Sequence, residues 1–279
     1  MSRDLFNAHL EKVLRQYESD FDGVIGIAFR DLVSNHSISI NGDRVFPIGS
    51  VIKIAILLEF FRQVTAGKLS GETRTWIEKE HKVPGSGVLQ YLGDHTTNCT
   101  LRDLAVLMIN LSDNTATNML IDLVGIENVN RTLQALGLRN TRLARKMMDI
   151  TAAMGGNENV STPNEIASLL IRLYSHDGIT KDVSEECLKI LKMPKSEDYL
   201  SSGLPPDTIL ANKPGQLPGI VSDCGIVYLS DRPYILCLMI TYLGNELAGE
   251  RIIRHISRTV FSHVSRVAKS SELGRRFSV

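Results

Sequence analysis

Residues 50–58 read Ser-Val-Ile-Lys-Ile-Ala-Ile-Leu-Leu, and the serine and the lysine are the only polar side chains in this run. A helix that is apolar all round lies in the interior of a protein. An ammonium group there carries a large desolvation cost, so Lys53 needs a compensating role. Residues three apart share a helix face, which lets the Lys53 amine reach the Ser50 hydroxyl. Burial favours the neutral amine, and a neutral amine can take the serine proton.

The residues before this run strengthen the interpretation, since a Ser-x-x-Lys string also arises by chance. Phe46-Pro47-Ile48-Gly49 interrupts the preceding segment and places Ser50 at or near a helix start. Free backbone N–H groups at a helix start favour developing negative charge. The context therefore favours a nucleophilic serine at position 50.

Two further strings carry polar groups of the same kind. Ser112-Asp113-Asn114 follows a predicted helix over 101–110, which Thr100 and Asp103 cap. Lys213-Pro214-Gly215 follows the strand-like run 208–212. Taken alone, the first string caps the next helix, over 115–124, and the second forms a turn.

In this order, the three strings resemble the signature of class A β-lactamases and penicillin-binding proteins. The similarity extends from about Gly23 to Tyr242 and includes Thr141–Arg145 and Ser161–Pro163, which look like the entry and exit of the family's omega-shaped loop. The resemblance implies that Ser50 is the acylated nucleophile and Lys53 its base or proton relay. It implies that Ser112 passes a proton to the leaving nitrogen.

The resemblance also assigns the substrate-binding groups. The Asn114 amide would hold an amide of the substrate, and Lys213 would supply positive charge near the substrate carboxylate. The backbone N–H groups of Ser50 and Gln216, which follows Gly215 directly, would form the oxyanion hole, often the largest electrostatic term in acyl transfer. No cofactor or metal is implied.

One departure from the family concerns release of the acyl group. Relatives carry a glutamate just after the arginine that closes the entry motif, and this glutamate activates the deacylating water. Here Met147 occupies that position, and a thioether cannot take a proton. Asp149 is the nearest candidate substitute base and Glu158 a more distant one. Alternatively, Asp149 forms a structural ion pair with Arg142 or Arg145, which is the commoner role.

A second departure is Pro214, where most relatives have a threonine or serine whose hydroxyl helps to hold a carboxylate. Proline offers neither that hydroxyl nor a backbone N–H, and within sheets it belongs on an edge strand. The sequence therefore predicts an edge strand that lines a cleft, with altered carboxylate recognition.

The coarse pattern predicts an α/β (α+β) fold. Its sheet has five mostly antiparallel strands, with terminal helices packed on a face, and an all-helical subdomain stands beside it. The expected strands cover residues 23–30, 37–40, 209–213, 224–229 and 235–242. A capping box at Thr162 to Glu165 starts a helix that runs to about Tyr174. Residues 1–48 and 195–279 would form the sheet subdomain, and residues 49–194 the helical one, with the cleft between them and a loose tail from Ser270.

Composition excludes several other classes. Thirty-one basic and 31 acidic residues leave no net charge to attract nucleic acid. No apolar run approaches the length of a membrane span. The seven histidines lack metalloprotease spacing, and the four cysteines show no metal-ligand spacing and read as buried thiols. The partner predicted for this protein is a small-molecule or peptide substrate, a β-lactam or a D-alanyl amide. Oligomeric state stays open.

The N-terminal segment bears on location. Phe6, Leu10, Val13, Leu14 and Tyr17 follow a helical spacing among charges, which indicates a docking helix rather than a signal peptide. This favours a cytoplasmic protein, or a secreted one whose leader has been removed.

Three functions are compatible with these residues. The first is a serine amidase that acylates and releases its product slowly. The second is an efficient β-lactamase with a substitute base, and the third is a binding or sensing module without turnover. Two lysines and two serines at the expected motif positions favour the first two functions.

Overall fold

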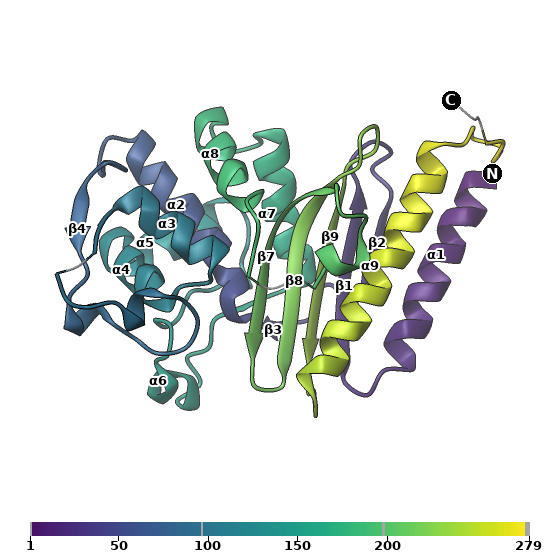
Figure 1. The fold of residues 1–279 in the computed structure, drawn as a ribbon. Helices are drawn as coiled ribbons and strands as arrows, with labels where there is room; N and C mark the ends of the chain where they lie inside the picture. The colour runs from purple at the N-terminus through teal and green to yellow at the C-terminus, as the bar shows by residue number, and fades with distance from the viewer. Residues whose placement is uncertain (1, 96, 197–198, 277–279) are drawn as a thin grey trace.

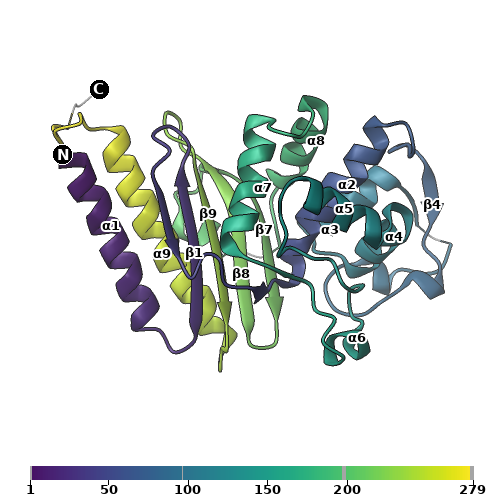
Figure 2. The same cartoon turned by 180° about the vertical axis from the view of Figure 1, so that it is seen from behind.

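The centre of the molecule is a five-stranded antiparallel sheet with helices on both faces (Figures 1 and 2). The computed structural model describes residues 2–95, 97–196 and 199–276. The strand order is β2-β1-β9-β8-β7, so β7 is an edge strand, as the proline at position 214 predicts. The strands are β1 (Val24–Asp31), β2 (Ser37–Ile40), β7 (Ile209–Leu217), β8 (Ile220–Tyr228) and β9 (Tyr234–Thr241).

The two terminal helices cover one face of this sheet, side by side (Figure 1). They are α1 (Ser2–Ser19) and α9 (Glu246–Ala268). Leu10 and Leu14 of α1 are buried with Ile253 and Val260 of α9, because apolar residues at helical spacing form one stripe on each helix. This confirms the predicted docking role of the N-terminal segment.

The remaining helices lie on the opposite face and beyond the β7 edge (Figures 1 and 2). They are α2 (Lys53–Thr65), α3 (Leu101–Asn110), α4 (Asn114–Val124), α5 (Ile126–Ala135), α6 (Ile150–Met154), α7 (Pro163–Ser175) and α8 (Lys181–Leu191). Short elements join them: β3 (Phe46–Pro47), β4 (Arg74–Trp76), β5 (Asn98–Thr100), β6 (Val160–Ser161), and the 3₁₀ turns η1 (Gly49–Ile52), η2 (Lys79–His81), η3 (Leu89–Tyr91) and η4 (Ser201–Gly203).

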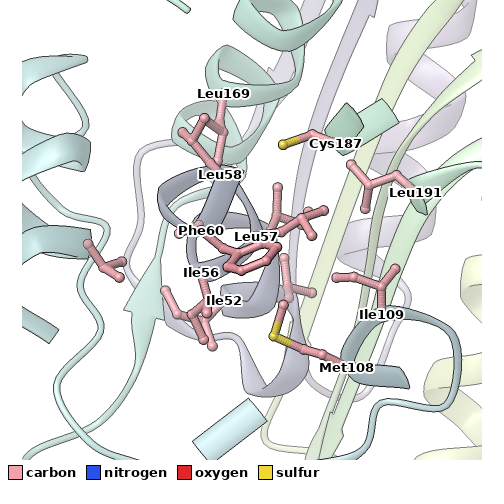
Figure 3. Packing of buried hydrophobic residues seen from close by; sticks show 14 of the residues in the cluster. Ile52, Ile56, Leu57, Leu58, Phe60, Met108, Ile109, Leu169, Cys187 and Leu191 are labelled. Carbon is pink, nitrogen blue, oxygen red and sulfur yellow. The ribbon is translucent and has the colours of Figure 1, made fainter. Parts of the chain in front are cut away.

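Helix α2 is the buried axis of this half of the molecule. Its residues from Lys53 to Phe61 are all buried, as its apolar sequence predicts. Figure 3 shows Ile56, Leu57 and Phe60 packed against Met108 of α3, Leu169 of α7 and Cys187 of α8. Because α7 also packs on β1 and β9, one hydrophobic core joins the helices to the sheet. The predicted division at residues 48/49 and 194/195 stays a prediction.

Most predicted elements occur at or near their predicted bounds. Helix α3 spans residues 101–110, and Thr100 and Asp103 form its capping box. Strand β7 is longer than predicted and continues to Leu217, so it includes the Lys-Pro-Gly string. The fold class is confirmed.

Two local predictions are wrong in detail. Thr162 caps α7, but the Glu165 carboxylate binds Asn140 and Thr141 instead of completing a capping box. Asn140 and Thr141 can donate to the Glu165 carboxylate because residues 140–141 lie beside the start of α7. The described part of the predicted tail is also ordered into a bridge between Ser270 and Arg276, and residues 277–279 lie outside the described residues.

Candidate active site

Ser50 lies in the 3₁₀ turn η1, directly before α2, which confirms its predicted place at a helix start. Gly49 precedes it with φ +49°, a conformation that glycine adopts without strain. The tight turn brings Ser50 against strand β7. A Cβ on Gly215 would lie 2.9 Å from the Ser50 nitrogen and 2.6 Å from the Ile48 carbonyl oxygen. Only glycine fits at position 215, which explains why β7 can approach the serine so closely.

The four polar groups predicted from the motifs form one hydrogen-bonded cluster. The Ser112 Oγ lies 2.8 Å from the Ser50 Oγ and donates to it. Lys53 Nζ and Lys213 Nζ each donate to the same Ser112 Oγ at 3.1 Å. Ser112 therefore stands between the nucleophile and both amines, and provides a path for the proton of Ser50.

Lys53 is fully buried and binds three acceptors. Its Nζ donates to the Ser112 carbonyl oxygen at 2.7 Å, to the Ser112 Oγ, and to the Asn114 Oδ1 at 3.1 Å. These contacts offset the cost of burying an amine in an apolar helix. The predicted burial of the Lys53 amine is therefore confirmed, and its Nζ contacts Ser112 and Asn114 of the Ser-Asp-Asn string.

The Ser-Asp-Asn string has an uncommon backbone. Ser112 has φ +53°, which is rare for a residue other than glycine and tends to occur at functional sites. The Asp113 carboxylate caps α4 through Ala116 N–H at 2.9 Å. It also accepts the N–H groups of Val88 and Leu89 at 2.7 and 2.9 Å. Asp113 thus does the capping expected of it and, in addition, anchors a distant loop.

That loop comprises residues 83–91. The structure makes it one wall of the site. Asn114 Nδ2 donates to the Pro84 carbonyl at 3.1 Å, and Asn114 N–H donates to the Ser86 carbonyl at 3.0 Å. Gly87 has φ +107°, and a Cβ there would overlap the Asp113 carboxylate. In the sequence, Gly85 and Gly87 were the features that could have indicated this close approach of the loop to Asp113 and Asn114.

The predicted oxyanion hole is compatible with the backbone. The N–H groups of Ser50 and Gln216 belong to η1 and β7. These two elements come into contact at Gly49 and Gly215. A Cβ on Gly49 would lie 3.3 Å from the Gln216 nitrogen. Gln216 is among the residues that line the cavity, and its side-chain Oε1 accepts a hydrogen bond from Tyr199 OH at 2.9 Å.

Lys213 is buried on β7 and donates to the Pro214 carbonyl at 2.8 Å as well as to Ser112. Asp223 on the adjacent strand β8 and Lys195 are its charged neighbours. Burial raises the pKa of Asp223 to about 6, although donors from Leu200 and the Asn212 side chain, and the Lys213 charge, counteract this. Burial, and then the Lys213 charge, lower the pKa of Lys195 to about 8.

A cavity of about 230 Å³ opens beside Ser50. Met147 lines it and is 8% exposed. The backbone of Met147 is held on both sides by the Asn118 side chain, whose Oδ1 accepts at 2.8 Å and whose Nδ2 donates at 3.1 Å. No sequence pattern indicated this clamp, since Asn118 lies in the middle of α4 and has the sequence context of an ordinary helical residue.

The two candidate substitute bases, Asp149 and Glu158, differ in their positions and in their hydrogen-bond partners. Asp149 is exposed and caps α6 through Ala152 N–H at 2.9 Å, and it is not among the residues that line the cavity. The predicted ion pair of Asp149 with Arg142 or Arg145 is wrong: no such pair occurs among the described residues, and Arg145 pairs with Glu158 at 2.7 Å instead. Glu158 does line the cavity. Its Oε1 accepts from two nitrogens of Arg145 and from Asn159 N–H.

The described residues show no group of histidine, cysteine and acidic side chains suited to a metal ion. Among the helices in the described ranges, none combines the length and the apolar character needed to cross a membrane. Cys187, Cys224 and Cys237 are buried thiols, and Cys99 is partly exposed.

Comparison with known proteins supports the interpretation of the site. The model of the Beta-lactamase enzyme family matches residues 8–264. Beta-lactamase SME-1 of Serratia marcescens is 25% identical, with 94% of this chain and 91% of that protein aligned. The crystal structure of a beta-lactamase from Sphaerobacter thermophilus has a TM-score of 0.85 and 30% identity, and covers 92% of this chain and 97% of its own.

A penicillin-binding protein is similar to the same degree. The structure of the PBP-A L158E mutant, an acyl-enzyme complex with penicillin G, has a TM-score of 0.83 and 29% identity over 91% of this chain and 96% of its own. With Ser50, Ser112 and the two lysines joined in one hydrogen-bonded cluster beside the cavity, the chain belongs to the beta-lactamase enzyme family, within the superfamily of class A β-lactamases and penicillin-binding proteins, and is a serine hydrolase of that type.

Proposed function

We propose that Ser50 is acylated by β-lactams or D-alanyl-type amides and that the acyl group leaves slowly. The observation that carries this proposal is Met147, buried in the cavity beside Ser50 at the position where relatives carry the deacylating glutamate. The relatives that are named beta-lactamases, and PBP-A with its penicillin G acyl-enzyme, support the substrate class.

Acylation follows from the hydrogen-bonded cluster. The Ser50 Oγ attacks the carbonyl carbon, and its proton passes through Ser112 towards Lys53. The new C–O bond forms while the N–H groups of Ser50 and Gln216 stabilise the oxyanion. The C–N bond then breaks, the leaving nitrogen takes a proton from Ser112, and Lys53 returns to Ser112 the proton that came from Ser50. Lys213, in contact with Ser112, provides positive charge for the substrate carboxylate.

Deacylation needs a second base, which must take a proton from an attacking water. The Met147 thioether cannot do this. Among the described residues that line the cavity, the carboxylate is that of Glu158, and its Oε1 is already bound by three N–H donors. Loss of a general base slows a step by roughly 10²- to 10⁴-fold, so the acyl-enzyme should accumulate.

A second candidate, an efficient β-lactamase, is kept because Glu158 lines the cavity. Time-resolved mass spectrometry after mixing with excess penicillin G, followed by removal of the free ligand, separates the two. An adduct on Ser50 that persists for minutes or longer supports slow release. Decay of the adduct within seconds would establish the efficient enzyme and refute our proposal. A folded protein that forms no adduct would be a binding module or act on another substrate.

A further inference from the structure

A second cavity, of about 400 Å³, lies between α2, α5 and the start of α8. Helix α2 packs on both of the other helices, so the cavity is enclosed by the helical half of the molecule. It shares no lining residue with the cavity beside Ser50. Small-molecule sites have volumes of about 300 to 1,000 Å³, and this cavity lies within that range.

Four aliphatic side chains form the apolar part of the lining. They are Leu58 of α2, Leu136 directly after α5, Ile179 before α8, and Val183 of α8. All four are buried and belong to the hydrophobic core of the helices. An alkyl chain in contact with these side chains would leave water and be stabilised in proportion to its buried area.

Arg62 of α2 brings hydrogen-bond donors to this cavity in a fixed orientation. The buried Glu59, one helical turn earlier, accepts from Arg62 Nε at 2.7 Å and from Arg62 Nη2 at 3.1 Å. Gln63 and Thr132 donate to the same carboxylate at 2.7 and 2.6 Å and hold it in place. A guanidinium has five N–H groups. No other hydrogen bond of the Arg62 side chain occurs among the described residues, so three N–H groups stay available to a ligand.

Arg131 of α5 gives the cavity an excess of positive charge. Its Nη1 donates at 3.0 Å to the Asn128 side-chain oxygen, which is neutral. None of the residues that line the cavity is acidic. Glu59 compensates the charge of Arg62, whereas no ion pair of Arg131 occurs among the described residues. A carboxylate suits this arrangement, because its two oxygens match the planar donors of a guanidinium.

We infer that this cavity is a binding site for small amphiphilic carboxylates, with the alkyl chain against Leu58, Ile179 and Val183 and the carboxylate on Arg62 and Arg131. A small inorganic anion would leave the aliphatic lining unused. A neutral alkyl compound would leave the two guanidinium groups without an anionic partner. The site is separate from the catalytic cluster and does not depend on acylation of Ser50.

The first test compares three ligands by isothermal titration calorimetry on the full chain. Octanoate should bind saturably, with a Kd below about 1 mM. Butanoate, which lacks four methylene groups, should bind at least about 10-fold more weakly. The neutral 1-octanol should also bind at least about 10-fold more weakly, since it offers no charge to the arginines. Absence of saturable octanoate binding, or equal affinity for either comparison ligand, would overturn the inference.

A pair of tryptophan variants locates the site. Ala135→Trp places a large ring at an exposed position that lines the cavity, and should raise the Kd for octanoate at least about 10-fold by occupying its volume. Gln134→Trp makes a similar surface change at the preceding exposed residue, which is outside the lining, and should keep the native Kd. Thermal unfolding checks that both variants fold. A native Kd in Ala135→Trp, or an equal loss in Gln134→Trp, would place octanoate elsewhere.

A second pair tests the charge. Arg131→Gln should raise the Kd for octanoate about 10-fold and leave the Kd for 1-octanol within about 2-fold, because it removes a charged donor and keeps the apolar lining. Arg139→Gln removes a positive charge from an exposed position outside the lining and should change neither value. Equal octanoate affinities in Arg131→Gln and the native protein would refute the assigned carboxylate contact.

Discussion

The two sides of the site differ in their chemistry. On one side, a continuous set of hydrogen bonds joins the partly exposed Ser50 to the buried Lys53, Ser112 and Lys213. On the other side, the segment 145–158 presents a buried thioether, and its cavity-lining carboxylate is bound by an arginine. Under the proposed function, the first arrangement forms the acyl-enzyme, and the second offers little to hydrolyse it. The two steps of a serine hydrolase therefore depend on separate regions of the chain.

The largest effect on acylation is expected from Ser50→Ala. Removing the nucleophile should eliminate the penicillin adduct completely, because no covalent bond can form without the Oγ. Intact-mass measurement after incubation with penicillin G checks this, with thermal unfolding as the control for folding. A remaining adduct of full occupancy would place the nucleophile elsewhere.

Met147→Glu tests the role of the segment 145–158 in hydrolysis of the acyl-enzyme. A carboxylate at this position could activate a water, so loss of the adduct should accelerate by roughly 10²- to 10⁴-fold. The decay of the acyl-enzyme mass gives the rate.

Met147→Gln is the matched control, because glutamine has the same shape as glutamate but carries a neutral amide, which cannot act as a general base. It should keep the slow decay of the native protein. Similar lifetimes in the glutamate variant and the native protein would mean that position 147 does not face the deacylating water.

The contact between η1 and β7 can be disturbed without removing a polar group. In Gly215→Ala the new Cβ would press on the Ile48 carbonyl and the Ser50 nitrogen, so the backbone around the oxyanion hole must move. We expect acylation to fall by about 10²-fold or more, since one oxyanion donor is worth that much. Stopped-flow acylation rates measure it. Gly244→Ala, where no atom lies within 4 Å of the new Cβ, should leave the rate unchanged. Equal rates in both variants would contradict the proposed close approach.

The smallest expected effect concerns stability near Lys213. The Asp223 pKa is about 6 in the folded protein against a reference of 3.8, so the folded state binds more protons between these values. The free energy of unfolding should therefore fall as pH rises from about 4 to 6, by ~3 kcal/mol from this group. Asp223→Asn removes this contribution.

Urea unfolding of both proteins at pH 4, 5, 6 and 7 tests the sign. Relative to the native protein, Asp223→Asn should gain stability as pH rises through this range, and the gain should level off above about pH 6. A difference that stays constant with pH would show that Asp223 is ionised throughout.

Local patterns were sufficient for much of this molecule. The spacing of apolar residues and the Thr100 cap determine α3, and the break before Ser50 determines the start of the catalytic turn. These signals are short-range, because a cap or a turn depends on neighbours within about four residues. The motif residues themselves, with their order along the chain, indicated which side chains would meet.

Tertiary structure alone decided the direction of side chains in the loops. Glu158 reaches the cavity and pairs with Arg145, 13 positions away in the chain. Asn118 holds Met147 from the middle of another helix. Each outcome depends on which distant donor or acceptor comes within about 3 Å, and that distance is set by the packing of whole helices rather than by residues adjacent in sequence.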